Sequence, residues 1–459
     1  MAARNPILNK DSYKLSHSAL YPSGITAMSA YITARKKFEL LTFFGLQIAL
    51  QDQEPIRQYH IDDAIKFAAA HGEPFDPKPW QKVLESYGGW LPLKIYAVAE
   101  GTNLPSGLPL VRIECEDPDL FWMAMDCETW LQRAVWYPTS IASNDLKNRR
   151  MLRRFLLETS DKPEHLDFML HDFGGRGVSS EETARIGGAA HLVHFCGSDT
   201  ISGTLEMNRV YRSPMAAFSV PASEHSVQCS WGPMHQEKYL EHVLDTYAKP
   251  GAIVSIVIDG YDTFREAERL CTDFKDQIIA SGAKIVFRPD SGDPIDIVPR
   301  LLKMQELAFG AKRNTKGFKV LNNVGVIQGD GVDYDKMEEV LEAVTRHRFA
   351  ADNIVFGSGG SLLQKVNRDT YGFAMKASAI KQNNAWRGIF KKPITDSGKT
   401  SEAGRMTLLR SKMTGEYMGA DLVAGRVDSE WEDVMPLVWD CGTMCITHTL
   451  DEVRKRARE

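Results

Sequence analysis

Acidic, basic and glycine-rich segments in the middle of this chain have the side chains that bind a phosphorylated sugar. Carboxylates suit sugar hydroxyls and hydrated Mg²⁺, arginines pair with phosphate oxygens, and glycines before a helix let backbone amides approach an anion. The acidic residues are Asp199, Asp259, Asp262, Asp290, Asp293, Asp330 and Asp333, the basic ones are Arg176, His225, Arg288 and Arg368, and the glycines cluster at 174–177 and 357–360. This set predicts a sugar phosphate and a metal ion as ligands rather than a hydrophobic molecule.

The segment after His171 has the strongest local signal for an anion site. Three glycines surround Arg176, and Ser179 followed by Glu182 fits a capping box at the start of a helix. A capped helix after an ordinary tight turn would have the same residues, so the segment alone leaves both interpretations open. His191 and His194, among alanine, leucine and valine, are interpreted as core residues and not as metal ligands.

Short apolar runs precede these polar residues and recur with a regular spacing. Runs at 253–258, 286–287, 324–327 and 354–356 each end in small or charged residues, roughly 30 to 40 residues apart. That distance accommodates one strand, one helix and two loops, and continuous Val/Ile runs indicate parallel strands buried on both faces. We therefore predict an irregular TIM-like α/β barrel over 151–384, whose active site lies at the carboxyl ends of the strands. A second αβ domain over 1–150 would be completed by 385–459.

Composition narrows the class of protein. The chain has 459 residues, 43% of them hydrophobic and 25% charged, with a formal net charge of -5, as in globular enzymes of two domains. The slight acidic excess disfavours nucleic acid as a partner. The absence of a signal peptide or long apolar stretch argues against a membrane. Seven cysteines, an odd number, predict reduced thiols and a cytoplasmic location.

Eight strings of the sequence, taken in order, resemble the nicotinamide phosphoribosyltransferase family. They lie at 11–14, 44–47, 171–180, 197–200, 219–226, 288–292, 326–333 and 356–365. The resemblance implies transfer of the phosphoribosyl group of phosphoribosyl pyrophosphate to nicotinamide, which gives nicotinamide mononucleotide and pyrophosphate in NAD salvage. It also implies a homodimer with shared active sites.

The resemblance assigns roles to individual residues. Phe173 and the second subunit's counterpart of Tyr13 would sandwich the nicotinamide ring, while Asp199 and Arg288 would bind its carboxamide. Contacts to the sugar and phosphates are implied for Asp290, Gly329 and Asp330 at the ribose, Gly359, Gly360 and Arg368 at the 5′-phosphate, Arg176 and His225 at pyrophosphate, and Lys376 and Lys391, with Arg35 and Lys399, at the phosphate entrance.

The resemblance further implies that Mg²⁺ is held through waters by Asp262 and Asp290 and neutralises the leaving pyrophosphate. His225 is a candidate phosphohistidine that would couple ATP, as an optional co-substrate, to product formation. Asp262, Asp290 and His225 are therefore the predicted catalytic residues. Departures from the family at Gly175, Ser361 and Ala374 concern the phosphate entrance.

Three alternatives remain at this point. A nicotinate phosphoribosyltransferase would share the fold and the sugar donor, but the Asp199 carboxylate would repel the carboxylate of nicotinate. A non-catalytic binding or signalling protein could use the same scaffold. A metal-dependent lyase is a third alternative, although no catalytic lysine or metal triad with suitable spacing is evident.

Overall fold

The computed structural model describes residues 5–395, 399–425 and 428–458, which form two compact units. Unit 1 comprises Met1–Ser143, Val210–Arg212 and Val366–Glu459, and unit 2 comprises Asn144–Arg209 and Ser213–Lys365. Helix α5 (Glu128–Thr159) contributes residues to both. None of the helices in the described ranges is both long enough and apolar enough to cross a membrane.

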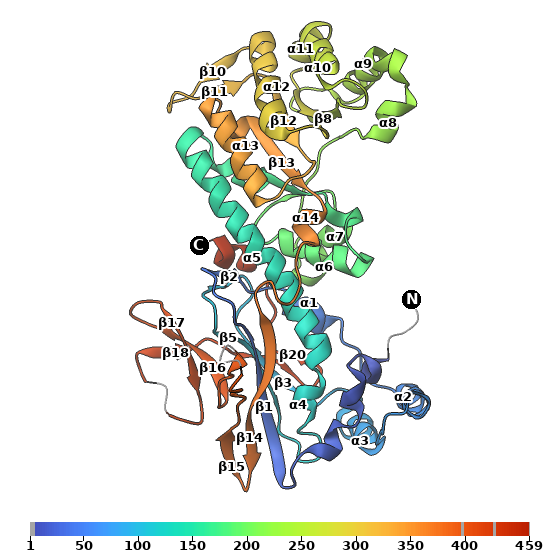
Figure 1. Ribbon diagram of the computed structural model, residues 1–459, viewed down its shortest axis with the longest axis vertical. Helices are drawn as coiled ribbons and strands as arrows, with labels where there is room; N and C mark the ends of the chain where they lie inside the picture. The colour runs from blue at the N-terminus through green and yellow to red at the C-terminus, as the bar shows by residue number, and fades with distance from the viewer. Residues whose placement is uncertain (1–4, 396–398, 426–427, 459) are drawn as a thin grey trace. The chain divides into compact units, whose positions relative to one another are not determined.

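Unit 1 is built on an antiparallel sheet of seven strands in the order β15-β14-β1-β5-β3-β19-β20 (Figure 1). Its strands are β1 (Ile25–Ala34), β3 (Lys94–Ala97), β5 (Pro109–Cys115), β14 (Phe373–Gln382), β15 (Ala385–Gly388), β19 (Leu437–Asp440) and β20 (Thr443–Met444). A three-stranded sheet of β16 (Met406–Ser411), β17 (Tyr417–Asp421) and β18 (Trp431–Asp433) and a short pair of β2 (Leu41–Thr42) and β4 (Asn103–Leu104) accompany it. The helices of this unit are α1 (Leu46–Gln51), α2 (Gln58–His71), α3 (Lys78–Tyr87), α4 (Met123–Asp126) and α15 (Leu450–Arg458).

The predicted domain boundary at residue 384 is wrong, because the boundary falls before strand β14, at residue 366. Strand β14 pairs along its whole length with β1, from Phe373 opposite Ala34 to Gln382 opposite Ile25. Because β14 supplies the partner that a central strand needs, residues 366–384 belong to unit 1. The N-terminal boundary falls at residue 143 rather than 150, inside helix α5.

Unit 2 is built on a parallel sheet with the strand order β7-β6-β13-β12-β9-β8. The strands are β6 (Leu170–Asp172), β7 (Gly197–Ser198), β8 (Ile253–Val257), β9 (Lys284–Arg288), β12 (Val324–Gln328) and β13 (Ile354–Ser358). A hairpin of β10 (Ala311–Arg313) and β11 (Lys319–Leu321) lies outside this sheet. The four apolar runs predicted to be strands are thus confirmed as β8, β9, β12 and β13.

The parallel sheet of unit 2 is curled. A single segment, 216–223, bonds to both edge strands: Phe218 N–H donates to the Cys196 carbonyl (2.8 Å) ahead of β7, and Ser255 N–H of β8 donates to the Pro221 carbonyl (2.9 Å). The curl forms the wall of a largely apolar cavity of about 250 Å³ that is open to solvent and whose lining includes Phe168, Phe218 and Val326. The predicted α/β class with parallel strands is therefore confirmed.

The helices of unit 2 connect successive strands of the sheet, except the last one, which follows β13. They are α6 (Glu181–His191), α7 (Ile201–Val210), α8 (His225–Ser230), α9 (Gln236–Tyr247), α10 (Thr263–Thr272), α11 (Lys275–Ser281), α12 (Pro294–Phe309), α13 (Tyr334–Arg346) and α14 (Gly360–Leu363). Helix α12 packs on β12 and is flanked by α10 and α13 (Figure 1). Asp262, Asp293 and Asp333 each cap one of these helices, because their side chains accept backbone N–H groups of the first turn.

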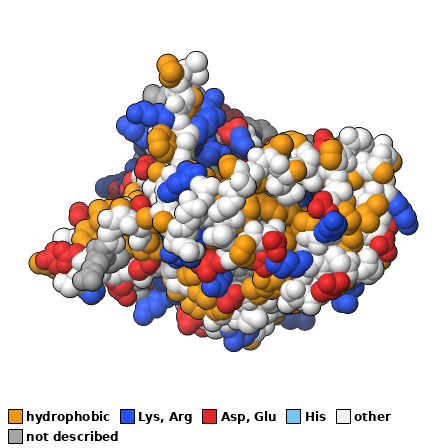
Figure 2. Space-filling view, turned by 90° about the horizontal axis from the view of Figure 1, so that it is seen from below, with side chains coloured by type: hydrophobic (Ala, Val, Ile, Leu, Met, Phe, Trp, Pro, Cys, Tyr) orange, Lys and Arg blue, Asp and Glu red, His pale blue; other side chains and the backbone are white. Residues whose placement is uncertain are grey.

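Charged side chains of both signs occur among apolar and polar ones on the face seen in Figure 2. This mixture agrees with 55 basic against 60 acidic residues in the chain. All seven cysteines are free thiols.

Candidate active site

The candidate active site of unit 2 lies where its parallel strands end. Parallel strands finish at one edge of a sheet, and this edge receives most of the predicted ligand-binding residues. Phe173 follows β6, Asp199 follows β7, Arg288 ends β9 with Asp290 beyond it, Gly329 and Asp330 follow β12, and Gly359 and Gly360 follow β13.

Phe173 is a half-buried aromatic ring held in a fixed position at this edge. Its N–H donates to the Ser358 carbonyl at 2.9 Å. A Cβ atom at Gly357 would lie 2.0 Å from Phe173 Cε2, so the ring occupies space that only glycine leaves. The Arg288 guanidinium carbon lies 5.3 Å from the ring centre, within the range of a cation–π contact.

A chain of charged groups runs from this ring to His225. Arg288 Nη2 lies 3.4 Å from Asp290 Oδ2, and His225 Nδ1 lies 4.0 Å from the same oxygen. His225 Nε2 makes a shorter contact, 2.9 Å, with Asp259 Oδ1. Burial raises the pKa of Asp290, the charge of Asp259 raises it further, and Arg288 and His225 oppose that rise. Asp290 is thus a partly desolvated carboxylate next to an arginine.

Asp259 is the site residue that sequence reasoning missed. It was noted among the acidic residues but received no role, whereas the structure makes it the nearest partner of His225. A positional signal could have found it. Asp259, Asp290 and Asp330 each lie two residues after a strand end, while the helix-capping Asp262, Asp293 and Asp333 each lie five residues after one.

Asp262 therefore has a structural function that its predicted metal role did not include. Its Oδ1 accepts the N–H groups of Phe264 and Arg265, both at 3.1 Å, at the start of α10. Within the described ranges, no group of three or more His, Cys, Asp or Glu side chains is arranged to hold a metal ion. Asp290, with its carboxylate neighbours, has the chemistry to hold hydrated Mg²⁺ together with substrate phosphates, which is how Mg²⁺ usually binds.

Two glycine-rich segments pack closely enough to bring their backbones into contact. A Cβ at Gly174 would lie 2.8 Å from the Gly359 carbonyl oxygen, and one at Gly177 would lie 3.0 Å from Gly360 Cα. The Gly174 N–H donates to Asp172 Oδ1 at 2.7 Å. Such backbone concavities bind anions. The exposed Arg176 lies beside this pair, with Nη2 3.9 Å from Glu224 Oε2.

The cap of helix α6 is one residue later than predicted. Ser180, and not Ser179, accepts the Thr183 N–H at 3.1 Å. Ser179 lies between the glycine turn and the cap, and its own N–H donates to Gln364 Oε1. The predicted helix after the glycines is nevertheless present.

Asp199 is an exposed carboxylate next to the strand that carries Phe173. Its N–H donates to the Asp172 carbonyl at 2.9 Å, and its Oδ1 accepts the Ser219 hydroxyl at 2.6 Å. Asp199 therefore presents a hydrogen-bond acceptor at a position fixed by two contacts.

The remaining predicted residues belong to unit 1. Burial lowers the pKa of Lys376, as do nearby Arg35, Lys391 and Arg368, although Glu128 opposes the shift. Four predicted basic residues thus gather into one group. Lys399 is at the edge of a described range.

Tyr13 is 53% exposed and its ring centre lies 5.0 Å from that of His17. The adjoining Lys14 is buried and donates to the Met125 carbonyl and to Glu128 Oε2, both at 2.8 Å. These contacts hold the short segment that presents Tyr13.

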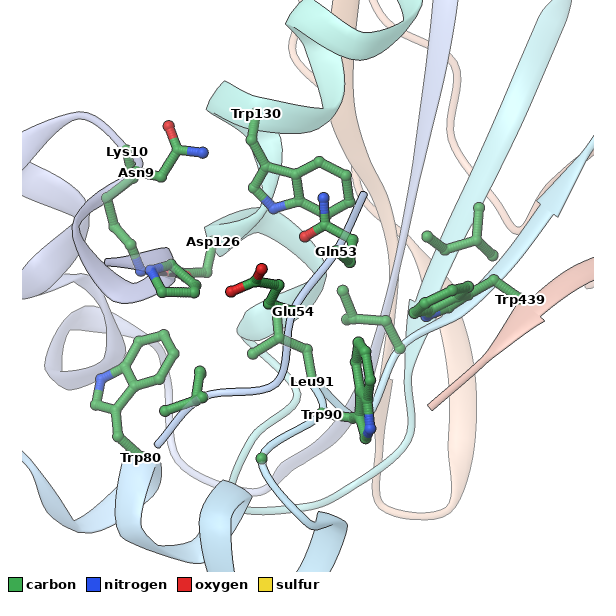
Figure 3. A pocket seen from close by; sticks show the side chains of 15 residues that line it. Asn9, Lys10, Gln53, Glu54, Trp80, Trp90, Leu91, Asp126, Trp130 and Trp439 are labelled. Carbon is green, nitrogen blue, oxygen red and sulfur yellow. Dashed lines mark hydrogen bonds and ion pairs between the residues drawn. The ribbon is translucent and has the colours of Figure 1, made fainter. Parts of the chain in front are cut away.

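A small cavity of about 50 Å³ in unit 1 contains none of the predicted residues (Figure 3). Four tryptophans, Trp80, Trp90, Trp130 and Trp439, line it. Lys10, whose amine lies 4.4 Å from the Trp80 ring centre, forms a buried ion pair with Asp126. Because these charges neutralise each other, the cavity is separate in chemistry from the carboxylate-rich site of unit 2.

Comparisons with known proteins match the whole chain. Residues 168–430 match the nicotinate phosphoribosyltransferase (NAPRTase) family, and residues 5–95 match the nicotinamide phosphoribosyltransferase N-terminal domain. A nicotinamide phosphoribosyltransferase of Xanthomonas campestris pv. campestris is 46% identical over 99% of this chain and 98% of its own length. One from Acinetobacter baylyi is 30% identical over 98% of this chain and 97% of its own.

Solved structures share the fold at low sequence identity. The nicotinate-nucleotide pyrophosphorylase of Pyrococcus furiosus aligns with a TM-score of 0.61 at 16% identity, covering all of this chain and 96% of its own. Human nicotinic acid phosphoribosyltransferase aligns with a TM-score of 0.57 at 14% identity over 98% and 92%. Both support the fold alone.

Proposed function

Because this chain belongs to the nicotinamide phosphoribosyltransferase family, we propose that it transfers the phosphoribosyl group of phosphoribosyl pyrophosphate to nicotinamide. The products are nicotinamide mononucleotide and pyrophosphate, and the reaction serves NAD salvage. The 46% identity to the Xanthomonas nicotinamide phosphoribosyltransferase, along almost the full length of both chains, carries this conclusion. The curled sheet of unit 2, whose edge strands both bond to 216–223, supports an irregular TIM-like barrel as the scaffold.

The nicotinamide end of the site is proposed to be formed by Phe173, Asp199 and Arg288. Phe173 stacks on the pyridine ring, and stacking adds about 0.5–1.5 kcal/mol to the burial of the ring. Asp199 accepts an N–H of the carboxamide, while Arg288, beside the Phe173 ring, donates to the carboxamide oxygen. The donor and the acceptor of the carboxamide thus both meet complementary partners.

The sugar and phosphate end is proposed to be formed by the remaining loops. The ribose meets Asp290, Gly329 and Asp330, the 5′-phosphate meets the amides of Gly359 and Gly360, and pyrophosphate meets Arg176 and His225. The close approach of the two glycine segments supports the phosphate assignment, because backbone without side chains lets an anion come close to the amides of Gly359 and Gly360. Lys376 and Lys391 would line the entrance with positive charge.

The chemistry needs charge stabilisation and alignment rather than a protein nucleophile. The C1–O bond to pyrophosphate breaks with its electron pair leaving on oxygen, and the pyridine nitrogen lone pair forms the new C1–N bond. The sugar carries positive charge in the transition state, which the Asp290 carboxylate stabilises at close range. No proton needs to move, so positioning by Phe173 supplies much of the rate.

Mg²⁺ is proposed to bind through waters on Asp290 and on the oxygen of Asp262 that does not cap α10. Its chemistry would be to neutralise the leaving pyrophosphate. Burial raises the pKa of Asp290, and the neighbouring Asp259 and Asp330 carboxylates add to that rise, which supports a cation at this position.

His225 is proposed as a phosphate acceptor from ATP. Asp259 accepts from Nε2–H, which leaves the Nδ1 lone pair to attack the terminal phosphorus while ADP departs. If ATP still stimulated nicotinamide mononucleotide formation equally in His225→Ala, this role would be excluded.

A homodimer with shared sites is proposed from the residues of unit 1. Tyr13 and Arg368 are exposed and would serve the neighbour's site. Mixing inactive Tyr13→Ala and Phe173→Ala proteins should restore activity, because a mixed dimer contains one site with both aromatics intact. No recovery after subunit exchange would contradict sharing. Free thiols at all seven cysteines support a cytoplasmic location.

Pyrophosphate release tests the function directly. The purified chain is mixed with phosphoribosyl pyrophosphate, Mg²⁺ and either nicotinamide or nicotinate, and pyrophosphate and nucleotide are measured. We expect release with nicotinamide and little with nicotinate. Preference for nicotinate would favour the alternative transferase, and no release with either would indicate a binding protein.

A further inference from the structure

His191, the last residue of α6, is a fully buried histidine whose two ring nitrogens both face acceptors. Nδ1 lies 2.8 Å from Asp145 Oδ2, and Nε2 lies 3.1 Å from the Gly197 carbonyl oxygen. The ring stacks on Phe195, with centres 5.3 Å apart and planes at 17°. The exposed fraction of His191 is 0%.

This geometry determines the charge of the ring. A carbonyl only accepts, so Nε2 must carry a proton. Both oxygens of Asp145 have a partner, because Oδ1 accepts the Asn148 amide at 3.2 Å and Oδ2 lies 2.8 Å from Nδ1. A carboxylate that accepts at both oxygens receives a proton donated by Nδ1 as well. A ring that donates from both nitrogens is an imidazolium.

The surrounding groups agree with that charge. Burial alone would lower the pKa of His191, but Asp145 and Asp172 outweigh it and the pKa is raised. The nearby His171 behaves oppositely, because burial lowers its pKa to about 4 and leaves it neutral. Asp145, Asp172 and His171 are the charged or titratable groups facing His191 from α5 and β6.

The imidazolium contacts the strand that presents Asp199. Strand β7 has only two residues, and Gly197 pairs with His171 of β6 while Ser198 pairs with Asp172. A Cβ at Gly197 would lie 2.4 Å from the His171 ring, so the strand is held tightly on that side. His191 supplies a hydrogen bond to the Gly197 carbonyl.

The same group acts on the turn that carries Phe173. Asp172 accepts the Gly174 N–H at 2.7 Å and so orders the residues on either side of Phe173. Burial raises the pKa of Asp172, and the nearby His191 opposes that rise and so favours its ionised form. Asp172 also accepts the Asp199 N–H through its carbonyl. One buried cation therefore hydrogen-bonds to the support of Asp199 and interacts electrostatically with Asp172, which supports Phe173.

We propose that His191, held as an imidazolium by Asp145, is a positioning residue that sets the relative placement of Asp199 and Phe173 and thereby the affinity and selectivity for nicotinamide. The inference rests on the proposed function. The proposal predicts that substitution of His191 raises the KM for nicotinamide but not the KM for phosphoribosyl pyrophosphate. A residue that only stabilises the fold would affect both KM values alike.

His191→Gln is the main test, because the glutamine amide donates to one acceptor but leaves the other unpaired. We expect the KM for nicotinamide to rise at least about tenfold, while the KM for phosphoribosyl pyrophosphate changes less than about twofold. Selectivity against nicotinate should fall in a competition assay. His194→Gln, at an equally buried histidine three residues later, controls for loss of a core imidazole.

Asp145→Asn separates charge from hydrogen bonding. The asparagine lets His191 become neutral while Nε2–H still donates to Gly197, so the nicotinamide KM should be intermediate. In the wild-type protein, nitrogen-resolved NMR should show both ring nitrogens of His191 protonated at neutral pH. Asp145→Asn should remove one of these protons.

The outcomes separate the two proposals. A wild-type protein that makes no nicotinamide mononucleotide would overturn the proposed function, and the NMR result would still report the charge of His191. An active wild type with a neutral His191, or a His191→Gln enzyme with unchanged nicotinamide KM and selectivity, would overturn the positioning role. Equal increases in both KM values, matched by His194→Gln, would reduce His191 to a stabilising residue.

Discussion

Replacing Asp199 by asparagine should change which pyridine the enzyme selects. Asp199→Asn keeps the size and the acceptor oxygen but removes the negative charge. The Ser219 hydroxyl, 2.6 Å from Oδ1, can still donate to the amide oxygen, so the side chain should keep its orientation. The change therefore isolates charge at the position proposed to face the carboxamide or carboxylate of the substrate.

The magnitude follows from two effects. Hydrogen bonds to charged groups contribute about 1 kcal/mol more than neutral ones, so kcat/KM for nicotinamide should fall about fivefold. Two like charges about 4 Å apart repel by about 1 kcal/mol in water and about 4 kcal/mol near a protein surface. Asp199 is exposed before binding, so about 1–2 kcal/mol of that repulsion is expected, and nicotinate should gain about 5- to 30-fold. The preference should thus shift by roughly 25- to 150-fold.

Competition between the two substrates is the appropriate assay. Nicotinamide and nicotinate are supplied together with phosphoribosyl pyrophosphate and Mg²⁺, and the two mononucleotides are separated and quantified. Ser219→Ala is the matched control, because it removes the neighbouring hydroxyl and leaves the charge, so its selectivity should stay close to wild type. If Asp199→Asn kept a product ratio within about twofold of wild type, charge at this position could not be the source of selectivity.

Three further predictions concern the ring, the metal side and the fold. Gly357→Ala would place a Cβ 2.0 Å from Phe173 Cε2; the displaced ring should raise the nicotinamide KM about 2- to 10-fold in steady-state kinetics, and an unchanged KM would contradict the proposed stacking. Because burial raises the pKa of Asp290, the carboxylate should be neutralised at a higher pH than an ordinary aspartate, so kcat/KM should fall as pH drops through that raised pKa. Asp290→Asn should remove this acidic limb of the pH profile and lower kcat about 10²- to 10³-fold, whereas a persisting limb would assign it elsewhere. Burial alone would raise the pKa of Glu114, but Arg405, with two hydrogen bonds of 2.8 Å, holds that pKa below its ordinary value. The ion pair therefore stabilises the folded protein above the unfolded-state pKa of Glu114, and this stabilisation is lost as the pH falls. Arg112 Nε stays 3.3 Å from Glu114 Oε1, so Arg405→Met should lower the free energy of unfolding by about 1–3 kcal/mol at neutral pH in urea titrations, with a smaller loss at acidic pH, and a loss independent of pH would disprove the ion-pair explanation.

Local sequence patterns were sufficient for four of the six strands in the parallel sheet of unit 2 and for the polar residues at their ends. The Val/Ile runs of β8, β9, β12 and β13 are continuous because both faces are buried, and this pattern is visible in one dimension. Parallel strands end at a common edge, so the polar residues that follow them had to converge. Arg288 and Asp290 could therefore be grouped before their contacts were known, whereas the role of Phe173 came from the family resemblance.

Only the tertiary structure decided which function each carboxylate of the group has. Asp259 and Asp262 are three residues apart in one loop, yet the first contacts His225 and the second caps α10. Whether an aspartate caps a helix depends on where the first helical turn begins. Whether an aspartate contacts a site residue depends on which neighbouring loop lies opposite it in the fold. Sequence alone marks both as polar residues after a strand.

The assignment of distant segments also depended on pairing in three dimensions. Strand β14 belongs to unit 1 because β1, more than 300 residues earlier, is its hydrogen-bonding partner. His191, interpreted from its alanine and leucine neighbours as a core residue, is indeed buried, but Asp145 on another helix gives it a charge. The sequence by itself determined the family, the strands and the carboxylate-rich edge, since these depend on local composition and order. Partnerships between residues far apart in the chain depended on the fold, because burial and opposing charges act through space.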